Sequence, residues 1–118
     1  AKLVRCVKGT VVDFAVDIRV GSPTYGKCVM VELSDENHLQ FFIPRGFAHG
    51  FAVMSPMAVF QYKCDEYYHP EAEGGISLIS PPEGLVLPID AAVAVMSEKD
   101  LRLPAFDSFV SPFIYGKI

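Results

Sequence analysis

The chain has 118 residues, 51% of them hydrophobic, and carries a formal net charge of −4 at pH 7 with a pI near 5.2. This length accommodates one domain with a modest core, so we expect residues 1–118 to form a single domain. Because the basic residues are scattered and the apolar runs are short, the sequence argues against nucleic-acid binding and against a membrane-spanning segment.

The three cysteines, Cys6, Cys28 and Cys64, lie far apart and show no C-x-x-C spacing. An odd number of widely spaced cysteines predicts free, reduced and mostly buried thiols rather than a disulfide framework. The first residues also lack the uninterrupted apolar core of a signal peptide. These features together predict a cytoplasmic protein.

Residues 3–7 and 12–18 are the first two predicted strands, because apolar and polar residues alternate along them with a period of two. In the second strand one face holds Val12, Phe14, Val16 and Ile18, and the other holds Asp13, Ala15, Asp17 and Arg19. Lys8-Gly9 supplies a turn between the two strands. The pattern therefore predicts a hairpin whose second strand has one apolar face.

The next four predicted strands come in two pairs. Residues 27–33 and 38–43 alternate on either side of a polar turn, and residues 48–54 and 58–64 lie on either side of Pro56. Each pair is predicted to form a hairpin. The chain would then contain six short strands in three consecutive hairpins.

Beyond Tyr68 the alternation weakens. Short strands at 76–79 and 85–87 and a helical turn at 97–100 are predicted, while two prolines keep the tail irregular. Short antiparallel strands punctuated by Gly and Pro predict an all-β fold, either a sandwich or a barrel of the jelly-roll type. Ligands of such folds commonly bind inside the mouth of the barrel.

Several classes of catalytic site lack their sequence signature. The three histidines, His38, His49 and His69, are widely separated and form no cluster with the spacing of metal ligands. A Gly-x-Ser-x-Gly nucleophile elbow and a Gly-rich phosphate loop are both missing from the sequence. We therefore expect no metal and no other cofactor, and acid–base chemistry remains the candidate.

His49 and Tyr62 are the strongest candidates for that chemistry. Each lies on an otherwise apolar face of a predicted strand and could project a polar tip into a binding site. Such placement removes a titrating group from water and adjusts its pKa. Taken singly, however, a lone His or Tyr on a strand is more often a structural residue.

Lys2 and Asp17 stand at the ends of the first two predicted strands, so that in a hairpin they could approach one another. If both are solvated, their contact is worth little. Parity also places Lys2, Asp17, His49 and Tyr62 on the polar-bearing faces of their strands. We therefore expect these four side chains at the mouth of the barrel, where they would contact a ligand.

Five segments, taken together, are more specific than any single motif. They are Lys2-Leu3-Val4-Arg5-Cys6-Val7-Lys8-Gly9, residues 16–26, Ile43-Pro44-Arg45-Gly46-Phe47-Ala48-His49-Gly50-Phe51, Tyr62-Lys63-Cys64-Asp65-Glu66-Tyr67-Tyr68 and Ser97-Glu98-Lys99-Asp100. In order and spacing they resemble the dTDP-4-dehydrorhamnose 3,5-epimerase family over nearly the whole chain. The resemblance implies a metal-free, cupin-type jelly-roll barrel that forms a homodimer. It also implies a dTDP-keto-sugar substrate, dTDP-4-dehydro-6-deoxy-D-glucose, which L-rhamnose synthesis converts to dTDP-4-dehydro-L-rhamnose.

The resemblance also implies roles for individual residues. The family inverts two carbons flanking a ketone by removing a proton on one face and returning one on the other. Tyr62 corresponds to the tyrosine acid, Lys2 to the lysine beside the ketone, and Asp100 to the aspartate that orients the family's histidine base. The positions that contact substrate correspond here to Lys2, His49, Glu73, Lys99 and, beside the nucleotide, Tyr68.

The chain departs from the family pattern in two places. The family's histidine base belongs to an Arg-Gly-Leu-His block that precedes the segment matching Lys2, so the chain resembles the C-terminal two-thirds of an epimerase. On that ground we expect little or no turnover from these 118 residues. Residues 76–95 differ from the tryptophan-containing stretch of the family, since this chain has no Trp.

Two other hypotheses fit the same features. A non-catalytic cupin that binds sugar nucleotides would keep the barrel and Lys99 but would not use Tyr62 as an acid. A cupin isomerase of dTDP-keto-sugars would need its own histidine base, and His49 is the candidate that lies within a predicted strand.

Overall fold

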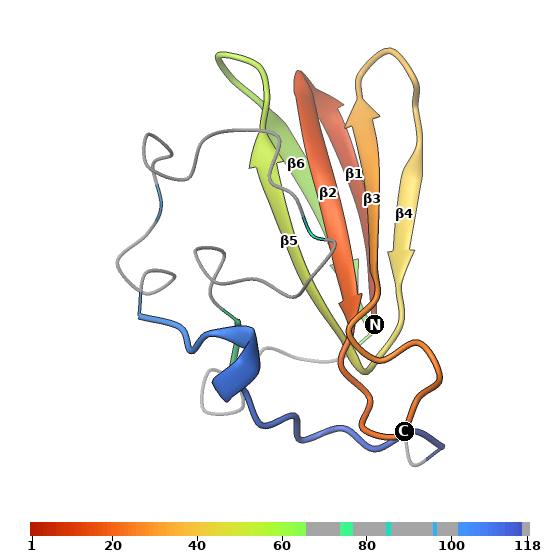
Figure 1. The fold of residues 1–118 in the computed structure, drawn as a ribbon. Coiled ribbons are helices and arrows are strands. Elements are labelled where there is room, and N and C mark those ends of the chain that lie inside the picture. Colours follow the sequence, from red (N-terminus) through yellow and green to blue (C-terminus); the bar gives the residue numbers. More distant parts are fainter. Residues whose placement is uncertain (66–73, 77–84, 86–95, 97–101, 117–118) are drawn as a thin grey trace.

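The computed structural model describes residues 1–65, 74–76, 85, 96 and 102–116. These residues form six strands and one short 3-10 turn (Figure 1): β1 (Lys2–Lys8), β2 (Thr10–Asp17), β3 (Cys28–Ser34), β4 (Gln40–Ile43), β5 (Phe47–Val53), β6 (Val59–Cys64) and η2 (Phe106–Ser108). All six strands predicted from alternation are confirmed, with ends within about two residues of those expected. The predicted turn at 97–100 and most of the strands predicted at 76–79 and 85–87 lie outside the described residues.

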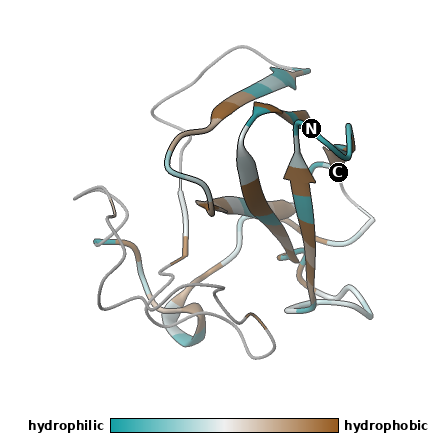
Figure 2. Ribbon diagram, turned by 90° about the horizontal axis from the view of Figure 1, so that it is seen from above, coloured by the Kyte–Doolittle hydropathy of each residue, from teal (hydrophilic) through white to brown (hydrophobic). Residues whose placement is uncertain are grey.

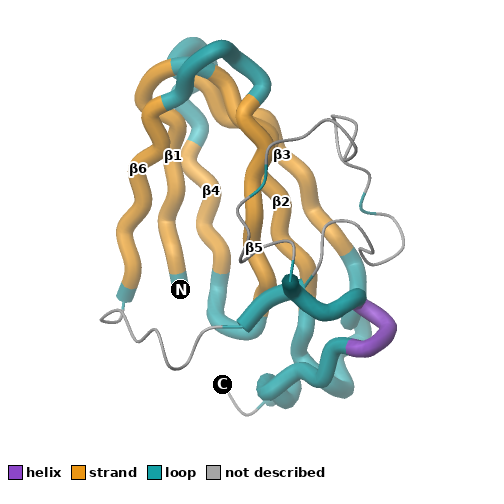
Figure 3. The backbone as a smooth tube through the Cα atoms, turned by 90° about the vertical axis from the view of Figure 1, so that its left-hand side faces the viewer, coloured by secondary structure: helices purple, strands orange, loops and turns teal. Residues whose placement is uncertain are grey.

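The strands are arranged in two antiparallel sheets that face one another. One sheet has the order β4-β1-β6 and the other has the order β3-β2-β5. In Figure 3 the two sets of three strands stand on opposite sides of the molecule. Side chains from both inner faces meet in a core formed by Val4, Cys6, Val11, Ala15, Leu33 and Ile43.

The three predicted hairpins are wrong. In each of them the two strands belong to opposite sheets, and the consecutive strands that pair are β2 and β3. Gly9 alone separates β1 from β2, with a φ of 85° that favours glycine and no room for a side chain beside the Met57 carbonyl. Alternation records which residues share a face, but it does not record whether a short connection stays in one sheet or crosses to the other.

Strand β2 is buried on both faces, whereas the sequence predicted one apolar face. Phe14, Val16 and Ile18 on its outer face form a second core cluster with Leu85, against which Phe109 and Phe113 pack. The opposite face points between the sheets. Figure 2 shows hydrophobic residues along the strands of both sheets, in agreement with these two cores.

The segment 102–116 lies along the end of the β3-β2-β5 sheet (Figure 1). The Val20 amide donates to the Phe113 carbonyl at 2.9 Å, and the Tyr115 amide donates to the Val20 carbonyl at 2.9 Å. Ser111 Oγ donates a further hydrogen bond to the Ile18 carbonyl. Within the described residues no helix is long and apolar enough to cross a membrane.

All three cysteines are free thiols, as predicted. The prediction that they are mostly buried is wrong, because Cys6 is buried, Cys28 is half-buried and Cys64 is exposed. Burial raises the pKa of the Cys6 and Cys28 thiols. Cys64 therefore offers the most accessible thiol of the three.

Candidate functional site

Lys2 and Tyr62 lie together on the inner face of the β4-β1-β6 sheet. Tyr62 is the register partner of Val4, a fully buried core residue, which places the phenol ring on the inner face. The Lys2 ammonium nitrogen lies 5.5 Å from the centroid of that ring, within the range of a cation–π contact. Tyr62 is nevertheless 59% exposed, so this part of the inner face is open to solvent.

His49 projects from the facing sheet and is paired with a buried aspartate that our sequence analysis missed as a site residue. His49 Nε2 lies 2.8 Å from Asp13 Oδ1 and 3.0 Å from Oδ2, and the hydrogen-bond geometry is satisfied at Oδ2. The Asp13 side chain is fully buried and that of His49 is 13% exposed. A buried carboxylate is costly unless it is paired, so this contact stabilises Asp13 as well as holding His49.

Two phenylalanines hold the His49 ring from the side. The ring stacks on Phe60 with centroids 6.4 Å apart and planes at 18°, and Phe60 stacks on Phe51 at 4.3 Å and 16°. Phe60 belongs to β6 and Phe51 to β5, so the stack joins the two sheets. Aromatic pairs of this kind contribute about 0.5–1.5 kcal/mol each beyond their burial.

Asp17 lies at the end of β2, and its carboxylate is fully occupied. Oδ1 accepts hydrogen bonds from the Arg19 amide and Nε, and Oδ2 accepts from the Arg19 guanidinium, Ser22 Oγ and Thr24 Oγ1. Chiefly because of Arg19, the pKa of the Asp17 carboxyl lies well below its usual range. The hairpin that was predicted to bring Lys2 to Asp17 is not formed, because β1 and β2 lie in different sheets.

Arg19 extends this cluster to the start of β5. Its guanidinium lies 4.9 Å from the Phe47 ring centroid and 5.0 Å from that of Tyr115. The Ile18 amide also donates to the Gly46 carbonyl at 3.0 Å. The loop after β2 therefore fixes the strand that carries His49.

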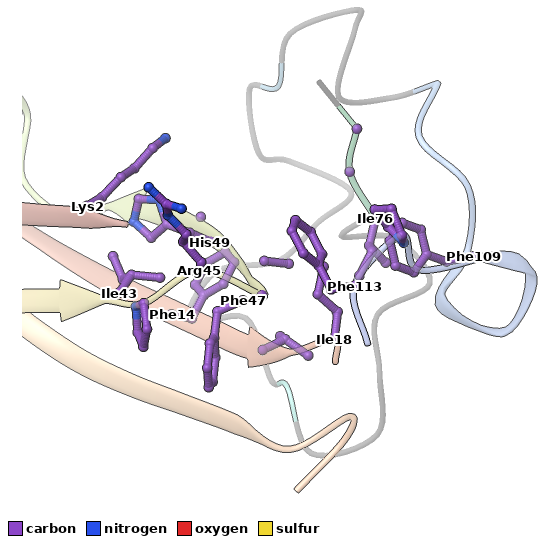
Figure 4. Close-up of a pocket in the computed structure, with 18 of the residues that line it drawn as sticks. Lys2, Phe14, Ile18, Ile43, Arg45, Phe47, His49, Ile76, Phe109 and Phe113 are labelled. Carbon is purple, nitrogen blue, oxygen red and sulfur yellow. The ribbon is translucent and has the colours of Figure 1, made fainter. Parts of the chain in front are cut away.

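A cavity of about 760 Å³ opens beside this site. Figure 4 shows Lys2, Arg45 and His49 at one end of it and apolar side chains such as Phe109 and Phe113 at the other. The cavity extends over the outer face of the β3-β2-β5 sheet, and Tyr62 is not part of its described lining. We take the inner-face residues as the candidate site, because they combine an imidazole, a cation and a phenol.

Arg45 is a second residue that sequence analysis did not single out, although it stands in the quoted 43–51 segment. It lines the cavity, and its guanidinium lies 3.1 Å from an Asp65 carboxylate oxygen. The ammonium of Ala1, 2.8 Å from the same carboxylate, is the main cause of a lowered pKa of the Asp65 carboxyl, and Arg45 adds to it. A cation next to Lys2 at the cavity end was therefore detectable only once the fold was known.

The structure leaves the other predicted site residues undecided. Tyr68, Glu73, Lys99 and Asp100 lie outside the described residues. Among the residues that are described, no group of three or more His, Cys, Asp or Glu side chains is placed to hold a metal ion.

Comparison with known proteins places this chain in a family. The model of the dTDP-4-dehydrorhamnose 3,5-epimerase family matches residues 1–108. A protein of that name from Methanothermobacter thermautotrophicus is 48% identical over 100 residues, which are 84% of this chain and 54% of the relative. Another, from Escherichia coli, is 47% identical over 109 residues, 92% of this chain and 58% of the relative. The chain thus spans little more than half the length of these curated relatives.

Solved structures agree with the sequence relatives. A dTDP-6-deoxy-D-glucose-3,5-epimerase from Legionella pneumophila, in complex with dTDP-4-keto-L-rhamnose, matches with a TM-score of 0.86 and 48% identity over 92% of this chain and 57% of that one. The dTDP-4-dehydrorhamnose 3,5-epimerase of Elizabethkingia anophelis matches with a TM-score of 0.85 and 51% identity over 90% and 58%. The two sheets therefore form the cupin-type jelly roll that the sequence predicted. The chain belongs to the dTDP-4-dehydrorhamnose 3,5-epimerase family.

Proposed function

We propose that this chain carries the sugar-nucleotide site of an epimerase that converts dTDP-4-dehydro-6-deoxy-D-glucose to dTDP-4-dehydro-L-rhamnose. The observation that carries the proposal is the grouping of an ammonium, a phenol and an imidazole at one inner surface, with Lys2 against Tyr62 and His49 paired to Asp13. Membership of the epimerase family and the keto-rhamnose bound to the Legionella relative support the same substrate class.

The chemistry follows from what these groups can do. When a base removes the proton on a carbon next to the ketone, the C–H bond breaks and an enolate forms. The Lys2 ammonium would stabilise the negative charge that develops on the ketone oxygen. The Tyr62 O–H bond would then break as a new C–H bond forms on the opposite face. The phenolate can recover a proton from water, because Tyr62 is 59% exposed.

In this proposal the base is not one of the described residues. The family resemblance assigns it to a histidine in a block that precedes the segment matching Lys2, oriented by the aspartate that corresponds to Asp100. A positioned base typically contributes about 10²–10⁴ to a rate. Glu73, Lys99 and Tyr68 are proposed as further substrate contacts.

The test uses Tyr62→Phe, with Tyr25→Phe as a matched control that removes a phenol from the loop between β2 and β3. Both variants are made in a form that includes the family's histidine block, and each is incubated with the keto-sugar in deuterated water. We expect Tyr62→Phe to lower epimerisation by about 10²–10⁴ and Tyr25→Phe to leave it unchanged. Equal epimerisation in the two variants would contradict Tyr62 as the acid.

The same experiment separates the proposal from a non-catalytic sugar-nucleotide-binding cupin. A binding protein would take up the keto-sugar without incorporating deuterium at either carbon. Deuterium incorporation by the form that includes the histidine block would exclude it.

Assembly and location are further proposals. We propose a homodimer on the basis of the family resemblance, and a cytoplasmic location on the basis of the three free thiols. Light scattering on the purified protein tests the first, since a monomer mass at micromolar concentration would contradict it. Fractionation of producing cells tests the second.

A further inference from the structure

We propose that Asp13 is the positioning residue of His49: its carboxylate fixes the imidazole with Nε2 as the donor and leaves Nδ1 for the ligand. The proposal rests on the proposed function in one respect, which is that the ligand is a sugar nucleotide. The orientation of His49 itself can be tested without any ligand.

The Asp13 carboxylate is buried in the core of the molecule. Asp13 lies on the inner face of β2 between Val11 and Ala15, both of them core residues, and its side chain is fully buried. Such a carboxylate requires a compensating partner. Among the described residues, His49 Nε2 is the group that hydrogen-bonds to it.

Asp17, the other buried carboxylate of β2, is bound differently. Asp17 accepts from an amide, a guanidinium and two hydroxyls within seven residues of itself. These local donors hold the Asp17 carboxylate within the loop that follows β2. Asp13 instead holds one imidazole from a strand 36 residues away, and within the described part of the chain Oδ1 accepts no directed hydrogen bond.

The contact with Asp13 determines which ring nitrogen of His49 carries the proton. An ionised carboxylate is an acceptor only, so the Nε2 that faces Asp13 must carry the proton. The same ring stacks on Phe60. His49 also lines the cavity end that holds Lys2 and Arg45 (Figure 4). Nδ1 is therefore the ring nitrogen that remains for a ligand hydroxyl or carbonyl.

The experiment observes the His49 ring by nitrogen-15 NMR in the ligand-free protein, with His49→Gln to assign the signal among the three histidines. We expect a protonated Nε2 whose proton exchanges slowly with water. Asp13→Asn, which keeps the shape and one acceptor oxygen, should retain part of this protection, and Asp13→Ala should abolish it. The control Asp17→Asn should lower the melting temperature and leave the His49 signal unchanged.

A second readout is the affinity for dTDP-L-rhamnose, a stable sugar nucleotide. We expect affinity to fall in the order wild type, Asp13→Asn, Asp13→Ala, with about a tenfold loss in the last, as for one lost hydrogen bond to a charged group. An unprotonated Nε2 in the wild type, or equal protection in Asp13→Asn and Asp13→Ala, would overturn the proposal. The expected ring signals without any binding would support Asp13 as the positioning residue and contradict the proposed function instead.

Discussion

Strand β2 carries two buried carboxylates, Asp13 in its middle and Asp17 at its end, and their hydrogen-bond partners differ. Asp17 is closed off by Arg19, Ser22 and Thr24, all close to it in the chain. Asp13 depends on His49 from another strand, and beside that pair the inner surface with Lys2 and Tyr62 stays open. Asp17, with many hydrogen bonds from nearby residues, stabilises the fold, whereas Asp13, with one partner from another strand, belongs to the candidate site.

The largest effect on stability should come from the saturated cluster. Asp17→Ala removes the partner of Arg19 and the acceptor of two hydroxyls. We expect a loss of about 3 kcal/mol in the free energy of unfolding, at the low end for a broken buried pair because Arg19 keeps access to water. Urea unfolding measures it. A loss below that of the surface variant Asp35→Ala would show that the cluster does not hold the scaffold.

A smaller effect should follow from the outer face of the strand that carries His49. Gly50 points away from His49, and a side-chain carbon there would lie 2.6 Å from the Phe14 ring. Gly50→Ala should therefore destabilise the chain by about 1–3 kcal/mol. Gly74→Ala, where no atom of the described residues lies within 4 Å, is the matched control and should be neutral. A large change in the His49 NMR signal with little change in the unfolding curve would show that the inner and outer faces of β5 do not act independently.

The pH dependence of stability sharpens the same comparison. The pKa of Asp17 is lowered in the folded state. Its contribution to the free energy of unfolding is therefore complete above the pKa of the unfolded state, near 3.8, and is lost as pH falls toward the pKa of the folded state. The difference in unfolding free energy between wild type and Asp17→Asn should be constant above about pH 5 and shrink below about pH 4. A difference that grows on acidification would contradict the direction of the shift.

The smallest effect concerns thiol accessibility. Cys64 is exposed and is the register partner of Lys2, whereas Cys6 is buried in the core. A maleimide should label Cys64 readily and Cys6 only on unfolding. Saturating dTDP-L-rhamnose should slow the labelling of Cys64 if the ligand occupies the inner surface beside Lys2. Mass spectrometry of the labelled peptides gives both rates.

Much of the fold was predictable, because strand alternation is a local property of the sequence. The six strands follow from it, but the pairing does not, since Gly9 turns the chain into the opposite sheet with no signal beyond a glycine. The site shows the same limit. Parity placed Lys2, His49 and Tyr62 on inner faces, whereas the role of Asp13 depends on a partner 36 residues away. Asp17 was predicted as a ligand contact, but Arg19 and the loop hydroxyls occupy it.

One measurement tests the division between scaffold and site most directly. The protein, labelled with nitrogen-15, is titrated with dTDP-L-rhamnose while its backbone amide shifts are followed. We predict saturable changes at Lys2, His49 and Tyr62, together with Asp13, and none across the 17–24 loop that Arg19 and Asp17 hold closed. Changes concentrated in that loop, with the inner surface unaffected, would contradict the account.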